Sequence, residues 1–292
     1  MAEVIASPST RRKALEKGVD LDARAKELGR TTLGPEDLGS AAALTASAGD
    51  PSYWDVDHSA FGPVTEEPMS RFAQVAAGNL GAANALIPQV THHDRADVSA
   101  IEGLRKAWRA EAQARGVKLT ALAFHVMALA RCLRDFPRFN ASLSPDGKTL
   151  VLKDYVHIGI AVDTPHGLMV PVIRDADRKG LWEISAEISN LATRAQSRKV
   201  TPDELGGASM TISNLGGIGG LGFTPIVNPP ELAILGITRT ETVTRWDGDI
   251  PRPVPMVPLD LSYDHRVING ADAGRFMRRH SGLIEEPEEI LT

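Results

Sequence analysis

The sequence predicts a mixed α/β protein in which a small helical unit precedes one larger domain. Helix-type and strand-type apolar patterns alternate from about residue 53 to the end. Residues 39–50 (GSAAALTASAGD) are rich in Gly, Ala and Ser, as flexible linkers are. We therefore expect a helical unit over residues 6–38, a linker over 39–52 and a core domain over 53–292.

Residues that typically start or end helices define the elements of the small unit. Residues 7–9 (SPS) offer a hydroxyl cap followed by a proline, which is typical of a helix start, and Gly18 is expected to end this helix. Residues 34–38 (GPEDL) are predicted to form a turn that opens a second short helix. Because a unit of so few residues can bury only a small core, we expect it to pack tightly or with help from a partner.

The core domain contains apolar patterns typical of helices and others typical of strands. Helical spacing of apolar residues predicts helices over residues 98–115, which end at Gly116, and over 119–134, 181–198 and 270–284. Apolar runs bounded by turn residues predict strands over residues 149–162, 167–173, 208–214, 231–238 and 256–263. No internal repeat interrupts this alternation.

Composition excludes several classes of protein. The 292 residues carry a net charge of −5, and the isoelectric point of about 5.9 argues against a nucleic-acid binder. No apolar stretch reaches the roughly 18 residues of a membrane helix, and the first residues lack the apolar centre of a signal peptide. The single cysteine, Cys132, lies in an apolar run and is interpreted as a buried small side chain. We expect a cytoplasmic protein.

The last predicted strand leads to a histidine. One face of this strand is apolar and the other carries several polar side chains; the two sets are Val257, Leu259, Leu261 and Tyr263, and Pro258, Asp260, Ser262 and Asp264. His265 follows at the connection to a helix that begins near Gly270. Imidazole suits proton transfer near neutral pH. With eight histidines in the chain, however, position alone does not favour His265 over His125 or His157.

Four ordered blocks make the case specific. They are residues 138–143 (RFNASL), residues 158–164 with 167–172 (IGIAVDT, GLMVPV), residues 210–217 with 223–230 (MTISNLGG, FTPIVNPP) and residues 262–271 (SYDHRVINGA). Together they resemble the dihydrolipoamide acyltransferases, the core components of 2-oxo acid dehydrogenase complexes, over about residues 55–292. The pyruvate (acetyl) type is the most similar. The resemblance implies a chloramphenicol-acetyltransferase-like fold of mixed sheet and helices.

The same resemblance implies a mechanism of acyl transfer between dihydrolipoamide and coenzyme A. His265, in the Asp-His-Arg motif that includes Arg266, would take the proton from the attacking thiol, since the thiolate is the nucleophile. Ser213, 52 residues earlier, would donate to the oxyanion of the tetrahedral intermediate. On its strand Ser213 shares a face with Thr211, opposite Met210 and Ile212. No covalent enzyme intermediate is required.

Substrates and partners follow from the family in the same way. Phe223 matches a position near the pantetheine of coenzyme A, although an ordinary core aromatic explains it equally well. The resemblance implies a homotrimer, alone or in a larger cage, with CoA entering from one side and a lipoyl arm from the other. The two catalytic side chains would come from neighbouring chains, so an isolated monomer should be inactive.

Two other motifs are interpreted as structural and not as ligand-binding sites. The glycine-rich residues 216–220 lack the Gly-Lys-Ser/Thr ending of a phosphate loop and are interpreted as a turn near the serine. His92 and His93 with Asp94 suggest metal ligation, but adjacent histidines rarely converge on one ion. No metal is expected.

Asn269 stands where the family pattern carries aspartate. In relatives that aspartate is expected to pair with an arginine, here Arg105, so asparagine would leave a neutral hydrogen bond and an arginine without its ionic partner. Asparagine still suits a helix N-cap. We expect a weakened or altered catalytic site, in which Asn269→Asp raises transfer activity.

The small unit resembles the peripheral subunit-binding domain of the same enzymes, which docks dehydrogenase subunits. The matching segments are residues 6–8 (ASP), 11–12 (RR), 18–21 (GVDL) and 36–38 (EDL). The family's Gly-Thr-Gly loop is replaced by residues 26–32 (KELGRTT), so docking of 2-oxo acid dehydrogenase or dihydrolipoamide dehydrogenase subunits is doubtful. No lysine lies in a lipoyl hairpin, so a lipoyl-bearing protein supplies the arm in trans or the chain is part of a longer protein.

Three functions remain open at this level. The first is transfer between CoA and dihydrolipoamide, favoured by His265 and Ser213. The second is a structural core that assembles and holds partner subunits without turnover, favoured by Asn269 and the altered docking loop. The third is an acyltransferase for a free small molecule, which the detailed blocks disfavour.

Overall fold

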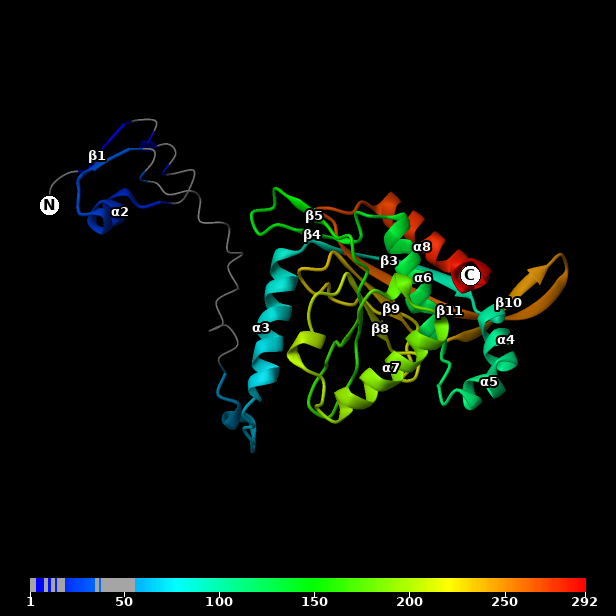
Figure 1. The fold of residues 1–292 in the computed structure, drawn as a ribbon. Helices are drawn as coiled ribbons and strands as arrows, with labels where there is room; N and C mark the ends of the chain where they lie inside the picture. Colours follow the sequence, from blue (N-terminus) through cyan, green and yellow to red (C-terminus); the bar gives the residue numbers. More distant parts are fainter. Residues whose placement is uncertain (1–3, 8–9, 12–13, 15–18, 35–36, 38–55) are drawn as a thin grey trace. The chain divides into compact units, whose positions relative to one another are not determined.

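A computed structural model describes residues 4–7, 10–11, 14, 19–34, 37 and 56–292, and Figure 1 shows its fold. The chain divides into two units, Met1–Glu66 and Glu67–Thr292. The predicted linker 39–52 and Gly18, the predicted end of the first helix, lie outside the described residues. Each unit is described by itself.

The small unit contains a helix and a short strand pair. Strand β1 (Ile5–Ala6) pairs in parallel with β2 (Thr32–Leu33), and helix α2 covers Leu21–Leu28. Asp20 caps α2 by accepting from Asp22 N and Ala23 N. The unit is therefore not purely helical, and residues 26–28 of the altered docking loop belong to α2.

Other parts of the small unit agree with the helix starts and turns predicted from the sequence. The Ser7 hydroxyl accepts from Thr10 N at 3.1 Å, as the predicted helix start requires. Gly29, at φ 64°, ends α2 in the left-handed conformation that glycine adopts readily. Asp37 pairs with Arg30 and accepts from Gly34 N. Most of the second helix predicted after the turn at 34–38 lies outside the described residues; Asp37 itself is in a 3-10 turn.

The larger unit contains a mixed seven-stranded sheet with the order β10-β11-β9-β8-β6-β7, and β3 pairs with β11. β6, β8 and β9 run parallel, whereas β11 runs antiparallel to β3, β9 and β10. The strands are β3 (Gln89–Asp97), β6 (Ile158–Ile160), β7 (Val172–Ile173), β8 (Met210–Asn214), β9 (Ala233–Ile237), β10 (Glu241–Asp247) and β11 (Ile250–Asp264). A separate hairpin pairs β4 (Ala141–Leu143) with β5 (Leu150–Leu152).

Seven α-helices occur among the described residues of the larger unit. They are α3 (Arg71–Leu86), α4 (Ser99–Ala107), α5 (Arg109–Ala114), α6 (Ala121–Asp135), α7 (Leu181–Gln196), α8 (Gly270–Glu285) and α9 (Glu288–Leu291). The predicted helix 98–115 is broken at Trp108, and the predicted strand 149–162 is divided into β5 and β6. Of the described residues, none belongs to a helix long and apolar enough to cross a membrane.

The two faces of the sheet differ in chemistry. Met210 and Ile212 of β8 and the alternate residues Leu259, Leu261 and Tyr263 of β11 join the main core, to which α6, α7 and α8 contribute. The opposite face carries Thr211 and Ser213 of β8, and Asp260, Ser262 and Asp264 of β11. Ala83 and Ile87, in and after α3, pack there against Val227 and Ile234. The predicted alternation of both strands is confirmed, but the polar side of β11 is buried as well.

A pair of histidines is buried in the main core. His125 Nδ1 on α6 and His280 Nε2 on α8 lie 3.1 Å apart, and the rings stack with centroids 5.3 Å apart. Burial lowers the pKa of His125 to about 4 and lowers that of His280 well below its ordinary value. Both rings are therefore neutral near pH 7. Cys132 is buried too, as predicted, and burial raises the pKa of its thiol to about 12.

Candidate active site

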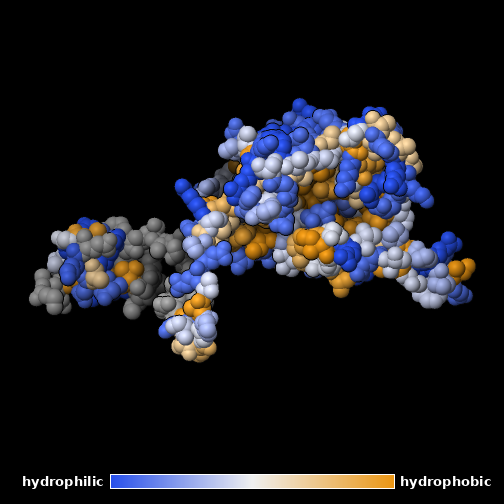
Figure 2. Space-filling view, turned by 90° about the horizontal axis from the view of Figure 1, so that it is seen from below, coloured by the Kyte–Doolittle hydropathy of each residue, from blue (hydrophilic) through white to orange (hydrophobic). Residues whose placement is uncertain are grey.

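Ser213 opens into a cavity on the polar face of the sheet. This cavity of about 680 Å³ lies between α3 and the strands, and its lining includes Thr211, Ser213 and Phe223. Figure 2 shows apolar side chains gathered between polar rims on the underside of the larger unit. An apolar cavity with a few convergent polar groups is typical of a ligand site.

Two features hold Phe223 in this cavity: a hydrogen bond from its backbone N–H, and a glycine on β9 that leaves space for its ring. Its N–H donates to the buried Asp260 carboxylate at 3.0 Å, and His93 Nδ1 contacts the other oxygen of that carboxylate at 2.6 Å. A Cβ on Gly236 would lie 2.7 Å from the Phe223 ring. Glycine at 236 therefore makes room for the ring beside Ser213.

The glycine-rich segment after β8 forms a hydrogen-bonded turn. Gly216 N donates to the Asn214 side chain at 2.8 Å, and Gly219 N donates to Leu215 O at 3.0 Å. Gly219 and Gly220 have φ values of 137° and 92°, which glycine adopts without strain. The segment is a turn next to the serine, as predicted.

His265 lies at the other end of the polar face. Its N–H donates to Pro88 O at 3.1 Å, and its exposed ring lies 5.7 Å from the Tyr263 ring, measured between centroids. The residues on either side are locked together: the Arg266 guanidinium binds the buried Asp264 carboxylate through Nε at 2.9 Å and Nη2 at 2.6 Å. Such a two-point ion pair fixes the strand-to-helix connection that carries the imidazole.

Ser213 and His265 of one chain do not meet. Ser213 lies opposite Gly236, which lies opposite Asp260 on β11. His265 follows five residues later, so it is about 17 Å further along the strand and about 10 Å across the sheet from Ser213. A thiol cannot contact both side chains within one chain. A site that uses both needs a second copy of the chain, as the resemblance implies.

Asn269 caps α8. Its Oδ1 accepts from Asp272 N at 2.9 Å, and its Nδ2 donates to Asp272 Oδ2 at 2.6 Å. Arg105 instead pairs with Glu102 and donates to Leu119 O at 3.3 Å. The expected pairing of Arg105 with position 269 is therefore wrong within this chain, because a neighbour on α4 already binds the guanidinium.

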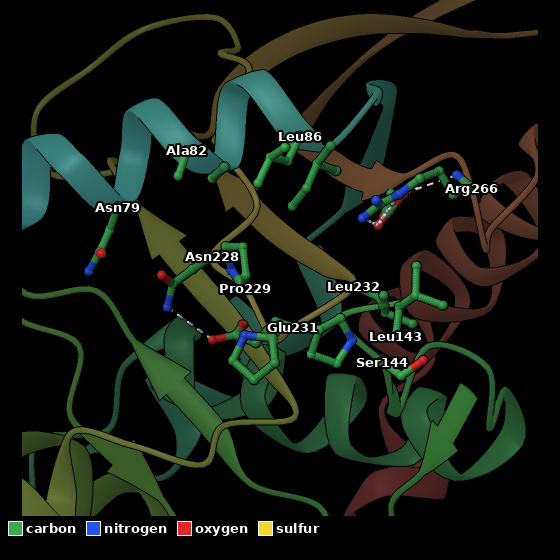
Figure 3. A pocket seen from close by; sticks show the side chains of 15 residues that line it. Asn79, Ala82, Leu86, Leu143, Ser144, Asn228, Pro229, Glu231, Leu232 and Arg266 are labelled. Atoms are coloured by element: carbon green, nitrogen blue, oxygen red, sulfur yellow. Dashed lines mark hydrogen bonds and ion pairs between the residues drawn. The ribbon is translucent and has the colours of Figure 1, made fainter. Parts of the chain in front are cut away.

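The structure adds a carboxyl group that sequence reasoning missed. Glu231 precedes β9, and its side chain accepts from Thr211 Oγ1 at 2.9 Å. It also accepts from Asn228 Nδ2 at 3.4 Å (Figure 3). Burial raises its pKa to about 7. The signal in the sequence was a glutamate at the start of an apolar predicted strand, where a side chain is expected to be buried.

Metal ligation finds no support among the described residues, which contain no group of three or more candidate ligands. His92 and His93 pair with Leu261 and Asp260, respectively, so they lie on opposite faces of the sheet. This confirms the argument that the adjacent histidines do not converge.

The family profile for the catalytic domain of 2-oxoacid dehydrogenase acyltransferases matches residues 61–292. The chain belongs to this family. Two curated relatives are dihydrolipoyllysine-residue acetyltransferase components of pyruvate dehydrogenase complex. The one from Pseudomonas aeruginosa is 45% identical over 302 residues, covering 99% of this chain and 55% of the relative. The one from Azotobacter vinelandii is 44% identical over 303 residues, covering 99% and 48%. The chain thus spans about half the length of these relatives.

Solved acyltransferase cores share its mixed α/β fold. A dihydrolipoamide acetyltransferase from Azotobacter vinelandii is 48% identical with a TM-score of 0.79, covering 81% of this chain and 98% of that one. A cubic core of the pyruvate dehydrogenase multienzyme complex gives the same values. A truncated core from Thermoplasma acidophilum is 36% identical with a TM-score of 0.71, covering 77% and 100%. The predicted α/β fold class is confirmed.

The first of these structures was solved to define the catalytic roles of a serine, a histidine and an asparagine. In that enzyme the histidine lies 52 positions after the serine, and the asparagine lies four positions after the histidine. Ser213, His265 and Asn269 of this chain have the same spacings. Asparagine at this point is therefore no departure from that relative, which removes the reason for expecting a weakened site.

Proposed function

We propose that this acyltransferase moves an acetyl group between dihydrolipoamide and coenzyme A, as the oligomeric core of a pyruvate dehydrogenase-type complex in the cytoplasm. The observation that carries the proposal is the shared spacing of the serine, histidine and asparagine studied in the Azotobacter vinelandii enzyme. The cavity that contains Ser213 and Phe223 supports it, because a thioester and its pantetheine arm need an apolar channel with few polar groups.

The chemistry requires one base and one hydrogen-bond donor. His265 accepts the proton of the attacking thiol, and the thiolate adds to the thioester carbonyl. Ser213 of a neighbouring chain donates to the oxyanion of the tetrahedral intermediate. Collapse expels the second thiolate, which takes the proton back from His265. Asn269 anchors the start of α8, just after His265, and Phe223 lines the path of the pantetheine.

The partners follow from the same assignment. We propose that the chain forms trimers, which assemble further in a larger core such as the cubic one solved for a relative. The lipoyl group comes from another protein or from a further part of the same one. The alternative of a scaffold without turnover loses the support that Asn269 lent it.

Replacement of His265 tests the proposed activity. With acetyl-CoA and free dihydrolipoamide as substrates, we expect His265→Ala to reduce kcat by about 10²–10⁴-fold, the usual contribution of a positioned general base. The exposed His58 lies in a 3-10 helix and provides the matched control, His58→Ala, which should keep the wild-type rate. Equal rates for His265→Ala and the wild type would end the enzymatic assignment in favour of a scaffold.

The corrected view of Asn269 changes the expected effect of Asn269→Asp. Aspartate caps a helix as well as asparagine does, but it removes the donor to Asp272 and places two carboxylates together. We expect no gain in acetyl transfer and a loss of about 0.5 kcal/mol in the free energy of unfolding, the size of a like-charge pair on a helix. Denaturant titration and the transfer assay measure both effects, and an increase in kcat would restore the earlier expectation.

A further inference from the structure

Glu231 lies in the wall between two cavities. It lines one of about 450 Å³, together with α3, the turn after β4, Asp264 and Arg266 (Figure 3). Its hydrogen-bond partner Thr211 lines the neighbouring cavity, in which Ser213 lies. With 4% of its surface exposed, Glu231 has a buried carboxyl group that contacts the strand of the proposed oxyanion donor.

The contact with Thr211 is built by several residues. Thr211 Oγ1 donates to Glu231 Oε1, which also accepts from Asn228. A Cβ on Gly159, across the sheet on β6, would lie 2.5 Å from Thr211 Oγ1, so glycine there leaves room for the hydroxyl. Glu231 Oε2 is buried and has no hydrogen-bond partner among the described residues. Only one of the two carboxyl oxygens therefore accepts a hydrogen bond. An ionised carboxylate would leave a charged oxygen buried without a partner, so the neutral form is favoured.

In the part of the chain that the structure describes, no neighbouring cation forms an ion pair that would stabilise Glu231 in its ionised form. Lys153 attracts it, but the Lys153 ammonium donates to Ala208 O rather than to Glu231. Asp264, across the cavity, is bound by Arg266. The α3 and β4 walls add only the uncharged polar residues Asn79 and Ser144, and His166 lines the Ser213 cavity. Burial therefore dominates and raises the pKa of Glu231 to about 7.

We propose that Glu231 is a positioning residue for acyl transfer: as a neutral acid it holds Thr211 and leaves Ser213 free to stabilise negative charge, and as a carboxylate it opposes that charge. This inference rests on the proposed function, in which an oxyanion forms at Ser213. Thr211 and Ser213 are on the same face of β8, about 7 Å apart along the strand. A negative charge on the buried Glu231, one hydrogen bond away from Thr211, raises the energy of the anionic transition state.

The predicted signature is an alkaline decline in kcat. As pH rises past about 7, Glu231 loses its proton, and we expect kcat to fall roughly tenfold at the alkaline plateau. KM for acetyl-CoA should change little, because the opposed charge develops only in the transition state. A general base is lost by protonation at low pH, so loss of the base cannot produce a decline at alkaline pH.

Two substitutions separate this role from simple packing. Glu231→Gln keeps an acceptor for Thr211 but is neutral at every pH, so the alkaline decline should disappear. Thr211→Val removes a donor that lowers the pKa of Glu231, so the decline should move to higher pH. Glu241→Gln, at an exposed position of β10, is the matched control and should keep the wild-type profile. The assay uses the assembled full-length chain with acetyl-CoA and dihydrolipoamide, with the uncatalysed rate subtracted at each pH.

The outcomes are distinguishable. Loss of the decline in Glu231→Gln with an upward shift in Thr211→Val supports the inference. A decline that persists unchanged in Glu231→Gln overturns it, while the proposed function stands. A wild type without transfer overturns both. If Glu231→Gln does not fold, the direction of the shift in Thr211→Val decides alone, and no shift or a downward one rejects the inference.

Discussion

Co-assembly of Ser213→Ala chains with His265→Ala chains is expected to restore acetyl transfer that neither variant has alone. Within one chain the two residues are separated along β11 and across two strands of the sheet. If each site combines Ser213 of one chain with His265 of the next in a ring, random mixing of equal amounts leaves roughly a quarter of the sites with both native residues. The co-assembled sample should therefore regain about a quarter of the wild-type rate.

A second mixture provides the control. Wild-type chains are co-assembled with chains that carry both substitutions. Sites shared between chains leave roughly a quarter of the wild-type activity, whereas sites within a chain leave about half. Light scattering must show the same particle mass in all samples. Mixed particles of the correct mass with no regained activity would disprove a shared site.

The buried pair of His125 and His280 is expected to make the protein sensitive to acid. An unfolded histidine has a pKa of about 6.5, but burial lowers that of His125 to about 4, and burial next to His125 lowers that of His280 well below its ordinary value. The unfolded chain therefore binds more protons, and the stability present above pH 6.5 is lost as pH falls toward 4. At pH 5, His125 alone should cost about 2 kcal/mol of unfolding free energy relative to pH 7.5.

Replacement of both histidines tests this expectation. His125→Leu combined with His280→Leu removes both partners of the hydrogen bond and leaves an apolar core, so the double variant should fold at pH 7.5. Urea unfolding at pH 7.5 and pH 5, at one protein concentration, gives the loss in stability for each chain. The wild type should lose several kcal/mol more than the double variant, and His58→Leu should resemble the wild type. Equal losses in all three would show that the pair has no such effect.

The sequence predicted those parts of the site that depend on local pattern. Strand periodicity placed Thr211 and Ser213 on the face opposite Met210 and Ile212, and the structure agrees. The turn residues after β11 placed His265 between a strand and a helix. These positions depend on neighbours within a few residues, so a single sequence contains the necessary information.

Contacts between distant segments could not be predicted in this way. The burial of Glu231 follows from its pairing with Thr211, 20 residues away. β3 was missed because several of its side chains are polar: Asp94, for example, binds Arg278 of α8 instead of joining an apolar stripe. α3 was missed because small residues fill it and only Ala83 on it is buried. Tertiary partners, and not local propensity, determine each of these features.

The fit of the Phe223 ring over Gly236 couples two positions that are 13 residues apart in the chain. A side chain can return to position 236 only when residue 223 becomes smaller, so the two sites should covary among homologues, with glycine accompanying an aromatic ring. Attempts to enlarge the cavity that contains Ser213 and Phe223 therefore have to treat both codons as a single variable.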